Sequence, residues 1–92
     1  MPRVTLTGRL ICSSSAEVNS VLTLLNEHVQ LTRAEAGCIS FQVTPTEDPW
    51  IWDVAEQFTD PQAFDAHQLR VASSLWGQGT SGIKREYRID GL

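Results

Sequence analysis

The chain has 92 residues, of which 41% are hydrophobic and 20% charged, and its formal net charge at pH 7 is -4. This length suits one domain with a single core, so we expect one unit over residues 1–92. The ordinary composition disfavours disorder, and the scattered basic residues disfavour generic nucleic-acid binding. No apolar run approaches the roughly 20 residues that span a bilayer, and the first residues do not resemble a signal peptide. We therefore expect no membrane contact and a cytoplasmic location.

The cysteine and histidine content argues against a metal centre. Cys12 and Cys38 have no neighbouring Cys or His at metal-ligand spacing, and His28 and His67 are the only histidines. We expect two reduced, partly buried thiols and no dedicated metal site.

The first half of the chain alternates between strand and helix patterns. Val4 to Leu10 has the period-2 alternation of a strand. Ser14 and Glu17 have capping-box spacing, and apolar residues then recur at helical intervals, which predicts a helix that Gly37 ends. Residues 38–44 alternate again, with Ile39 and Phe41 expected in the core.

A turn-forming stretch at 45–49 separates this strand from a third strand over residues 50–58. Its alternation places five residues on one face: Trp50, Trp52, Val54, Glu56 and Phe58. The third strand therefore carries a carboxylate among aromatic side chains.

The second helix is predicted to begin at Asp60, as the N-cap, and Pro61, in the first helical position. It is expected to end near Trp76 and Gly77, and the glycines that follow indicate a loop. Residues 83–89 alternate as a final strand.

The order β-α-β-β-α-β predicts an α+β fold, the ferredoxin-like βαββαβ sheet. Both helices should cover one face of the sheet. Because most strands carry apolar residues on both faces, we expect the second face to pair with another sheet in a homodimer.

Two stretches resemble the antibiotic biosynthesis monooxygenase family. The first is the run Leu31-Thr32-Arg33-Ala34-Glu35-Ala36-Gly37-Cys38-Ile39-Ser40-Phe41, which is similar to the family's junction between the first helix and the second strand. The second is Glu56-Gln57-Phe58 followed by Asp60, Ala63-Phe64 and His67, which resembles its third strand and second helix start. Together the matches cover most of residues 16–71.

The resemblance implies a dimeric α+β barrel, with a pocket between sheet and helices in each subunit. It also implies oxidation of quinol- or anthrone-like aromatics by dioxygen without flavin or metal. One departure is that some quinol-type relatives have a second histidine after the first, where this chain reads Arg70-Val71-Ala72-Ser73-Ser74. The haem-degrading branch is disfavoured because its ligand set cannot be placed on this chain.

His67 and Glu56 are the candidate catalytic residues. An imidazole titrates near neutral pH and can remove a phenolic proton, although a structural histidine at the core edge would look the same. Glu56 could orient His67 or pair with Arg70, or it could form a plain buried ion pair.

Aromatic and cationic side chains supply the candidate substrate contacts, with core packing as the alternative for the aromatic ones. They are Trp50, Trp52, Phe41, Phe58, Phe64, Arg70 and Trp76. His28 is expected to be structural. Arg85, Tyr87 and Arg88 are expected at the partner subunit, with Tyr87 alternatively a proton donor.

The leading functional hypothesis is a cofactor-free monooxygenase in which His67 acts as the base and Glu56 orients it. A non-catalytic small-molecule-binding dimer is the main alternative. A related isomerase or decarboxylase is the third.

Overall fold

The structure is a computed structural model of the chain, and residues 3–92 are described. Its elements are β1 (Val4–Ile11), α1 (Ser15–Arg33), β2 (Cys38–Pro45), β3 (Ile51–Phe58), α2 (Pro61–Ala72), α3 (Leu75–Gly79) and β4 (Lys84–Asp90). Within residues 3–92, no helix is both long and apolar enough to cross a membrane.

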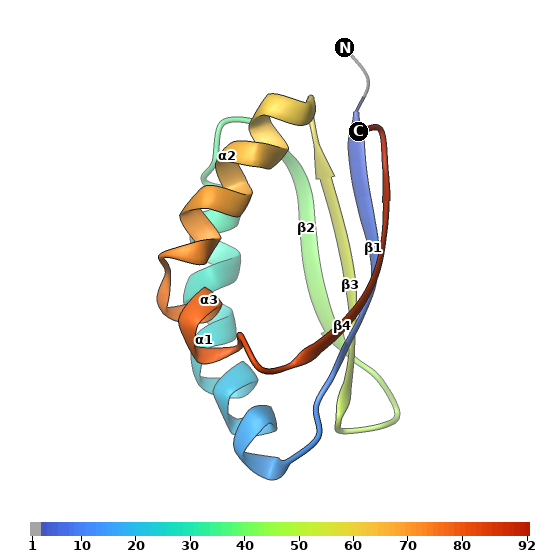
Figure 1. Cartoon of the computed structure of the whole chain (residues 1–92), viewed down its shortest axis with the longest axis vertical. Coiled ribbons are helices and arrows are strands. Elements are labelled where there is room, and N and C mark those ends of the chain that lie inside the picture. Colours follow the sequence, from blue (N-terminus) through green and yellow to red (C-terminus); the bar gives the residue numbers. More distant parts are fainter. Residues whose placement is uncertain (1–2) are drawn as a thin grey trace.

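The four strands form one sheet in the order β2-β3-β1-β4, and every neighbouring pair is antiparallel. All three helices lie on the same face of this sheet (Figure 1). The α+β ferredoxin-like βαββαβ prediction is therefore confirmed, with α3 as a short addition before the last strand.

The core lies between the sheet and the helices. Alternate strand residues such as Val4, Leu6 and Leu10 are at most 2% exposed, as the period-2 pattern requires. Both predicted helix starts are confirmed: the Ser14 side chain accepts a hydrogen bond from the Glu17 backbone N–H, and the Asp60 carboxylate accepts one from Ala63. These caps satisfy N–H groups that the first helical turn leaves free.

Gly37 does not end the first helix, contrary to the sequence prediction. α1 ends at Arg33, and Gly37 lies in the turn before β2. A Cβ atom on Gly37 would stand 2.2 Å from the Ala63 Cβ, so the glycine lets this turn pack closely against α2.

The second helix is also shorter than predicted. α2 ends at Ala72, and the Ser74 hydroxyl then caps α3 by accepting a hydrogen bond from the Gly77 N–H. Gly77 and Gly79 are therefore helical rather than part of a loop. The chain changes direction at this break, and Trp76 is buried, with 5% of its surface exposed.

Two residues were predicted on the inner face of the sheet and lie elsewhere. The β2–β3 register shifts between Cys38 and Ser40, so Ile39 falls in a bulge and is 42% exposed instead of filling the core. Trp50 lies in the turn before β3, where its backbone N–H donates to the Asp48 carboxylate, and it is 41% exposed.

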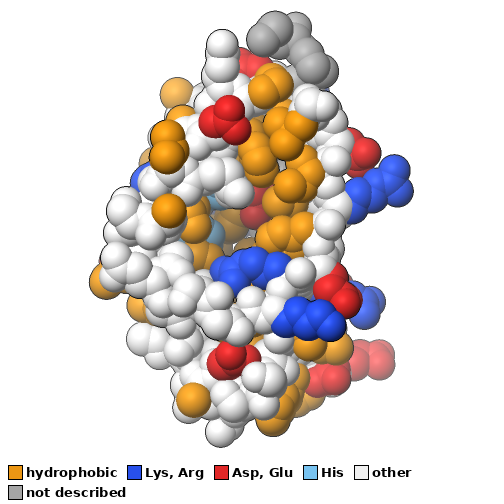
Figure 2. Space-filling view, viewed as in Figure 1, with side chains coloured by type: hydrophobic (Ala, Val, Ile, Leu, Met, Phe, Trp, Pro, Cys, Tyr) orange, Lys and Arg blue, Asp and Glu red, His pale blue; other side chains and the backbone are white. Residues whose placement is uncertain are grey.

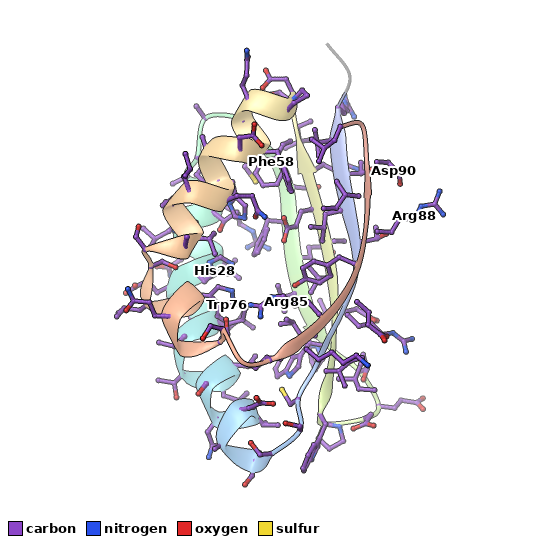
Figure 3. The ribbon with its side chains drawn as sticks, in the orientation of Figure 1. His28, Phe58, Trp76, Arg85, Arg88 and Asp90 are labelled. Atoms are coloured by element: carbon purple, nitrogen blue, oxygen red, sulfur yellow. The ribbon has the colours of Figure 1, made fainter. Side chains whose placement is uncertain are left out.

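The face of the sheet away from the helices is largely polar, which corrects the expectation of apolar residues on both faces. Its charged residues form pairs with one another, among them Arg9 with Asp53 at 3.5 Å and Arg88 with Asp90 at 3.3 Å. Figure 3 shows Arg88 and Asp90 on the side of β4 away from the helices. Ile11 and Ile51 are half-buried, apolar exceptions.

Candidate functional site

A cavity of about 380 Å³ lies between the sheet and the helices. Figure 2 shows its mouth as a hollow beside β4, with acidic and histidine side chains deep inside and a basic side chain across it. The apolar part of its wall includes Leu6, Leu10, Phe41, Val43, Val54 and Trp76, and the polar part includes His28, Glu56, His67, Arg85 and Tyr87. A mostly apolar chamber with a few inward polar groups is typical of a small-molecule site.

The sheet register supplies the floor of this cavity. Glu56 on β3 lies between Phe41 on β2 and Leu6 on β1. In the next inward row, Gly8 lies opposite Tyr87, and a Cβ on Gly8 would stand 2.0 Å from the Glu86 carbonyl oxygen. Glycine thus allows β4 to approach closely while Tyr87 faces the cavity.

His67 is the central polar group. It is 3% exposed, and its Nδ1 atom lies 2.8 Å from Glu35 Oε1. Because the other oxygen of Glu35 accepts a hydrogen bond from Arg70 Nε at 2.6 Å, Glu35 is a carboxylate acceptor and Nδ1 carries the proton. The Nε2 atom of neutral His67 therefore presents a lone pair.

Burial lowers the pKa of His67, while the hydrogen bond and charge of Glu35 act in the opposite direction. Aromatic rings hold the imidazole in place, with Phe58 at a centroid distance of 4.8 Å and Phe41 at 6.0 Å. The neutral ring is thus available as a proton acceptor near neutral pH.

Glu56 faces the free side of that imidazole. Its Oε1 atom lies 3.8 Å from His67 Nε2, which is too long for a hydrogen bond, and has no hydrogen-bond partner among residues 3–92. Burial, followed by repulsion from Glu35, raises the pKa of Glu56 to about 7, although Arg85 acts against this rise. A buried oxygen without a partner, facing a cavity, is a natural contact for a ligand.

His28 and Trp76 form a stacked pair at one wall, with ring centroids 4.6 Å apart and an interplanar angle of 3°. Burial is the main reason that the pKa of His28 is lowered to about 3. Electrostatic repulsion from His67, Arg70 and Arg85 lowers this pKa further. Figure 3 shows His28, Trp76 and Arg85 converging on the space between helices and sheet. His28 therefore contributes a neutral ring to the cavity wall.

The structure separates the predicted site residues into groups. Phe41, Glu56, His67 and Trp76 line the cavity together. Trp52, Phe58 and Phe64 are buried in the core outside the cavity lining, and Phe64 packs edge-on against Phe58 at 5.7 Å. Trp50 lies away from the cavity, in the turn before β3.

Arg70 does not pair with Glu56. It binds Glu35, and its Nη2 atom donates to the Thr32 hydroxyl at 2.9 Å. Arg85 and Tyr87, predicted at a subunit contact, line the cavity, and burial raises the pKa of Tyr87.

Glu35 is the residue that the sequence analysis missed as a functional candidate. It occurs in the family-like stretch before Gly37, but 32 residues separate it from His67. Only the packing of the α1 end against α2 brings the two together. Among residues 3–92, no cluster of three His, Cys, Asp or Glu side chains has an arrangement that could hold a metal ion.

The fold and the cavity define the class: a ferredoxin-like α+β domain with a buried histidine between two carboxyl groups. The family model for antibiotic biosynthesis monooxygenases matches residues 15–72, well over half of the chain. The chain therefore belongs to the antibiotic biosynthesis monooxygenase family. A search of curated proteins finds no significant match.

Solved structures share the fold over nearly the whole chain. A candidate antibiotic biosynthesis monooxygenase from Nitrosomonas europaea superposes with a TM-score of 0.80 at 15% identity, covering 98% of this chain and 97% of its own. A Pseudomonas aeruginosa protein gives 0.75 at 22% identity, covering 100% and 93%. A second such candidate, from Deinococcus radiodurans, gives 0.74 at 20% identity, covering 97% and 91%.

Proposed function

We propose that this protein is a cofactor-independent monooxygenase that oxidises a quinol- or anthrone-like aromatic with dioxygen. The observation that carries the proposal is the buried His67, whose Nδ1 is fixed by Glu35 and whose Nε2 faces Glu56 and the cavity. Family membership supports the reaction class.

The reaction begins with transfer of a hydroxyl proton from the substrate to His67 Nε2. The resulting aromatic anion supplies electrons to dioxygen, and a carbon–oxygen bond forms to give a ring hydroperoxide. Cleavage of the O–O bond leaves one oxygen atom on the ring as a carbonyl and releases the other as water. The substrate loses two hydrogen atoms to that water, so no external reductant is needed.

The cavity supports this scheme in two ways. Its apolar walls, including Phe41 and Trp76, exclude water and hold a planar ring near the base. The protonated form of Glu56, favoured below pH 7, can donate a hydrogen bond to the developing peroxide oxygen.

Oxygen uptake by the metal-free protein, measured across a panel of quinols and anthrones, tests the proposal. We expect uptake above spontaneous autoxidation, and a fall of about 10²- to 10⁴-fold in His67→Ala, the range that a general base contributes. Glu27→Gln, which changes an exposed side chain outside the cavity lining, is the control. Uptake no faster than autoxidation would contradict the proposal and favour the non-catalytic binding module, or an isomerase or decarboxylase.

We further propose a homodimer in which the outer faces of two sheets meet. No element within residues 3–92 covers this face, and its exposed charged pairs, such as Arg9 with Asp53, could exchange partners across an interface. Such contacts weaken when about 1 M salt shortens the screening length to about 3 Å. Sedimentation should show dimers at low salt that dissociate more readily at high salt. A monomer under both conditions would contradict this assembly.

A further inference from the structure

A second, more open hollow of about 640 Å³ lies behind the cavity. Its lining includes Glu35, Gly37, Thr59, Asp60 and Arg70. His67 also lines this hollow and is the residue that it shares with the cavity. The imidazole of His67 therefore forms the partition between the cavity and the second hollow.

The two ring nitrogens face opposite sides of this partition. Nε2 is directed toward Glu56, which lines the cavity, at 3.8 Å. Nδ1 is bonded to Glu35, which lines the second hollow, at 2.8 Å. The Glu35 side chain is 19% exposed, whereas that of Glu56 is 8% exposed, so Glu35 has the better access to water.

Arg70, held by Thr32, fixes the position of the Glu35 carboxylate. Arg70 Nε donates to Glu35 Oε2 at 2.6 Å, and Arg70 Nη2 donates to the Thr32 hydroxyl at 2.9 Å. Glu35 Oε1 is thereby left for the imidazole. A hydrogen-bonded path thus runs from His67 to a partly solvated carboxylate without passing through the cavity mouth.

We propose that His67 and Glu35 form a proton relay, with the substrate cavity as its inlet and the second hollow as its outlet. The assignment of the inlet rests on the proposed function. When Nε2 takes the substrate hydroxyl proton, the Nδ1 proton passes to Glu35 Oε1 and then to water. In the peroxide stage Nε2 returns a proton to the peroxide oxygen, and Nδ1 is reprotonated from water through Glu35.

The relay gives protons a route through the second hollow, whereas the substrate enters through the cavity mouth. A substrate ring that fills the cavity blocks water at the mouth, so a base reached only from that side could exchange its proton with the substrate but not with water. The second hollow removes this restriction. A purely structural ion pair between Glu35, in the turn after α1, and Arg70, on α2, would not carry protons between the cavity and water.

The kinetic test compares the buffer dependence of turnover in the wild type, Glu35→Gln and Glu35→Asp. Glutamine can accept the Nδ1 hydrogen bond but cannot take up the proton. We expect wild-type turnover to be independent of buffer concentration and Glu35→Gln to be slower, by up to about 100-fold. Added imidazole should restore its rate, and Glu35→Asp should need no rescue. Glu27→Gln, which changes an exposed carboxylate on α1, the helix that precedes Glu35, is the matched control.

A second measurement needs no substrate, and it separates failure of the relay from failure of the proposed function. Nitrogen-15 NMR of the folded proteins reports the exchange of the His67 Nδ1 proton with water. Exchange should be several-fold slower in Glu35→Gln than in the wild type, Glu27→Gln and Glu35→Asp. Equal exchange in all four proteins, or a slow Glu35→Gln enzyme that imidazole does not restore, would overturn the relay.

Discussion

Glu56 is a buried carboxyl group without a hydrogen-bonded partner, so its replacement by glutamine should change stability in a pH-dependent way. Burial is the main cause that raises its pKa in the folded protein from the ordinary 4.5 to about 7. Glutamine has nearly the same shape and never ionises. The substitution therefore removes the cost of ionising a carboxyl group in this environment.

The direction of the effect on stability depends on whether the folded or the unfolded chain loses the Glu56 proton first. Below pH 4.5 both the folded and the unfolded chain hold the Glu56 proton, and no cost arises. Between 4.5 and about 7 the unfolded chain ionises first, so this group lowers the free energy of unfolding as the pH rises. The difference between these pKa values corresponds to about 3 kcal/mol at about 1.4 kcal/mol per pH unit.

Glu56→Gln should therefore match the wild type near pH 4 and be more stable by up to about 3 kcal/mol at pH 8. Urea unfolding at both pH values, followed by tryptophan fluorescence at one protein concentration, gives the free energies. Glu27→Gln serves as the control, because its carboxylate is exposed. A difference between Glu56→Gln and the wild type that stays constant from pH 4 to pH 8 would refute the reasoning.

Two further substitutions test the packing around the site. Gly37→Ala should destabilise the fold by about 1–3 kcal/mol, since the new Cβ would stand 2.2 Å from that of Ala63. Thermal unfolding checks this, with Gly82→Ala as the control because its Cβ would meet nothing closer than 3.7 Å; equal losses would contradict the close packing. Trp76→Ala should cost about 3–5 kcal/mol and raise the pKa of His28 from about 3 toward its ordinary 6.5, because the stacked ring no longer excludes water. NMR titration of the imidazole measures that pKa, and an unchanged value would show that Trp76 does not bury the histidine.

Part of the site could be predicted because single residues signal it. His67 on a helix face and Glu56 on an aromatic strand face both line the cavity, as expected. His67 Nε2 and Glu56 Oε1 are 3.8 Å apart, too far for the predicted contact to be a hydrogen bond. Glu35 instead accepts the hydrogen bond that orients the imidazole. Sequence spacing gives no indication of this bond, since Glu35 lies in the turn after α1 and His67 lies on α2, and the two meet only when both helices pack on the sheet.

The amino-acid sequence by itself determined the element types and their order, because period-2 and helical patterns and the caps at Ser14 and Asp60 act over a few residues. Tertiary structure decided where those patterns stop. The bulge at Ile39 arises in the pairing of β2 with β3, and the break between α2 and α3 brings Trp76 onto His28 of α1. It also decided that His67 separates two hollows, since that position depends on the sheet, α1 and α2 at once.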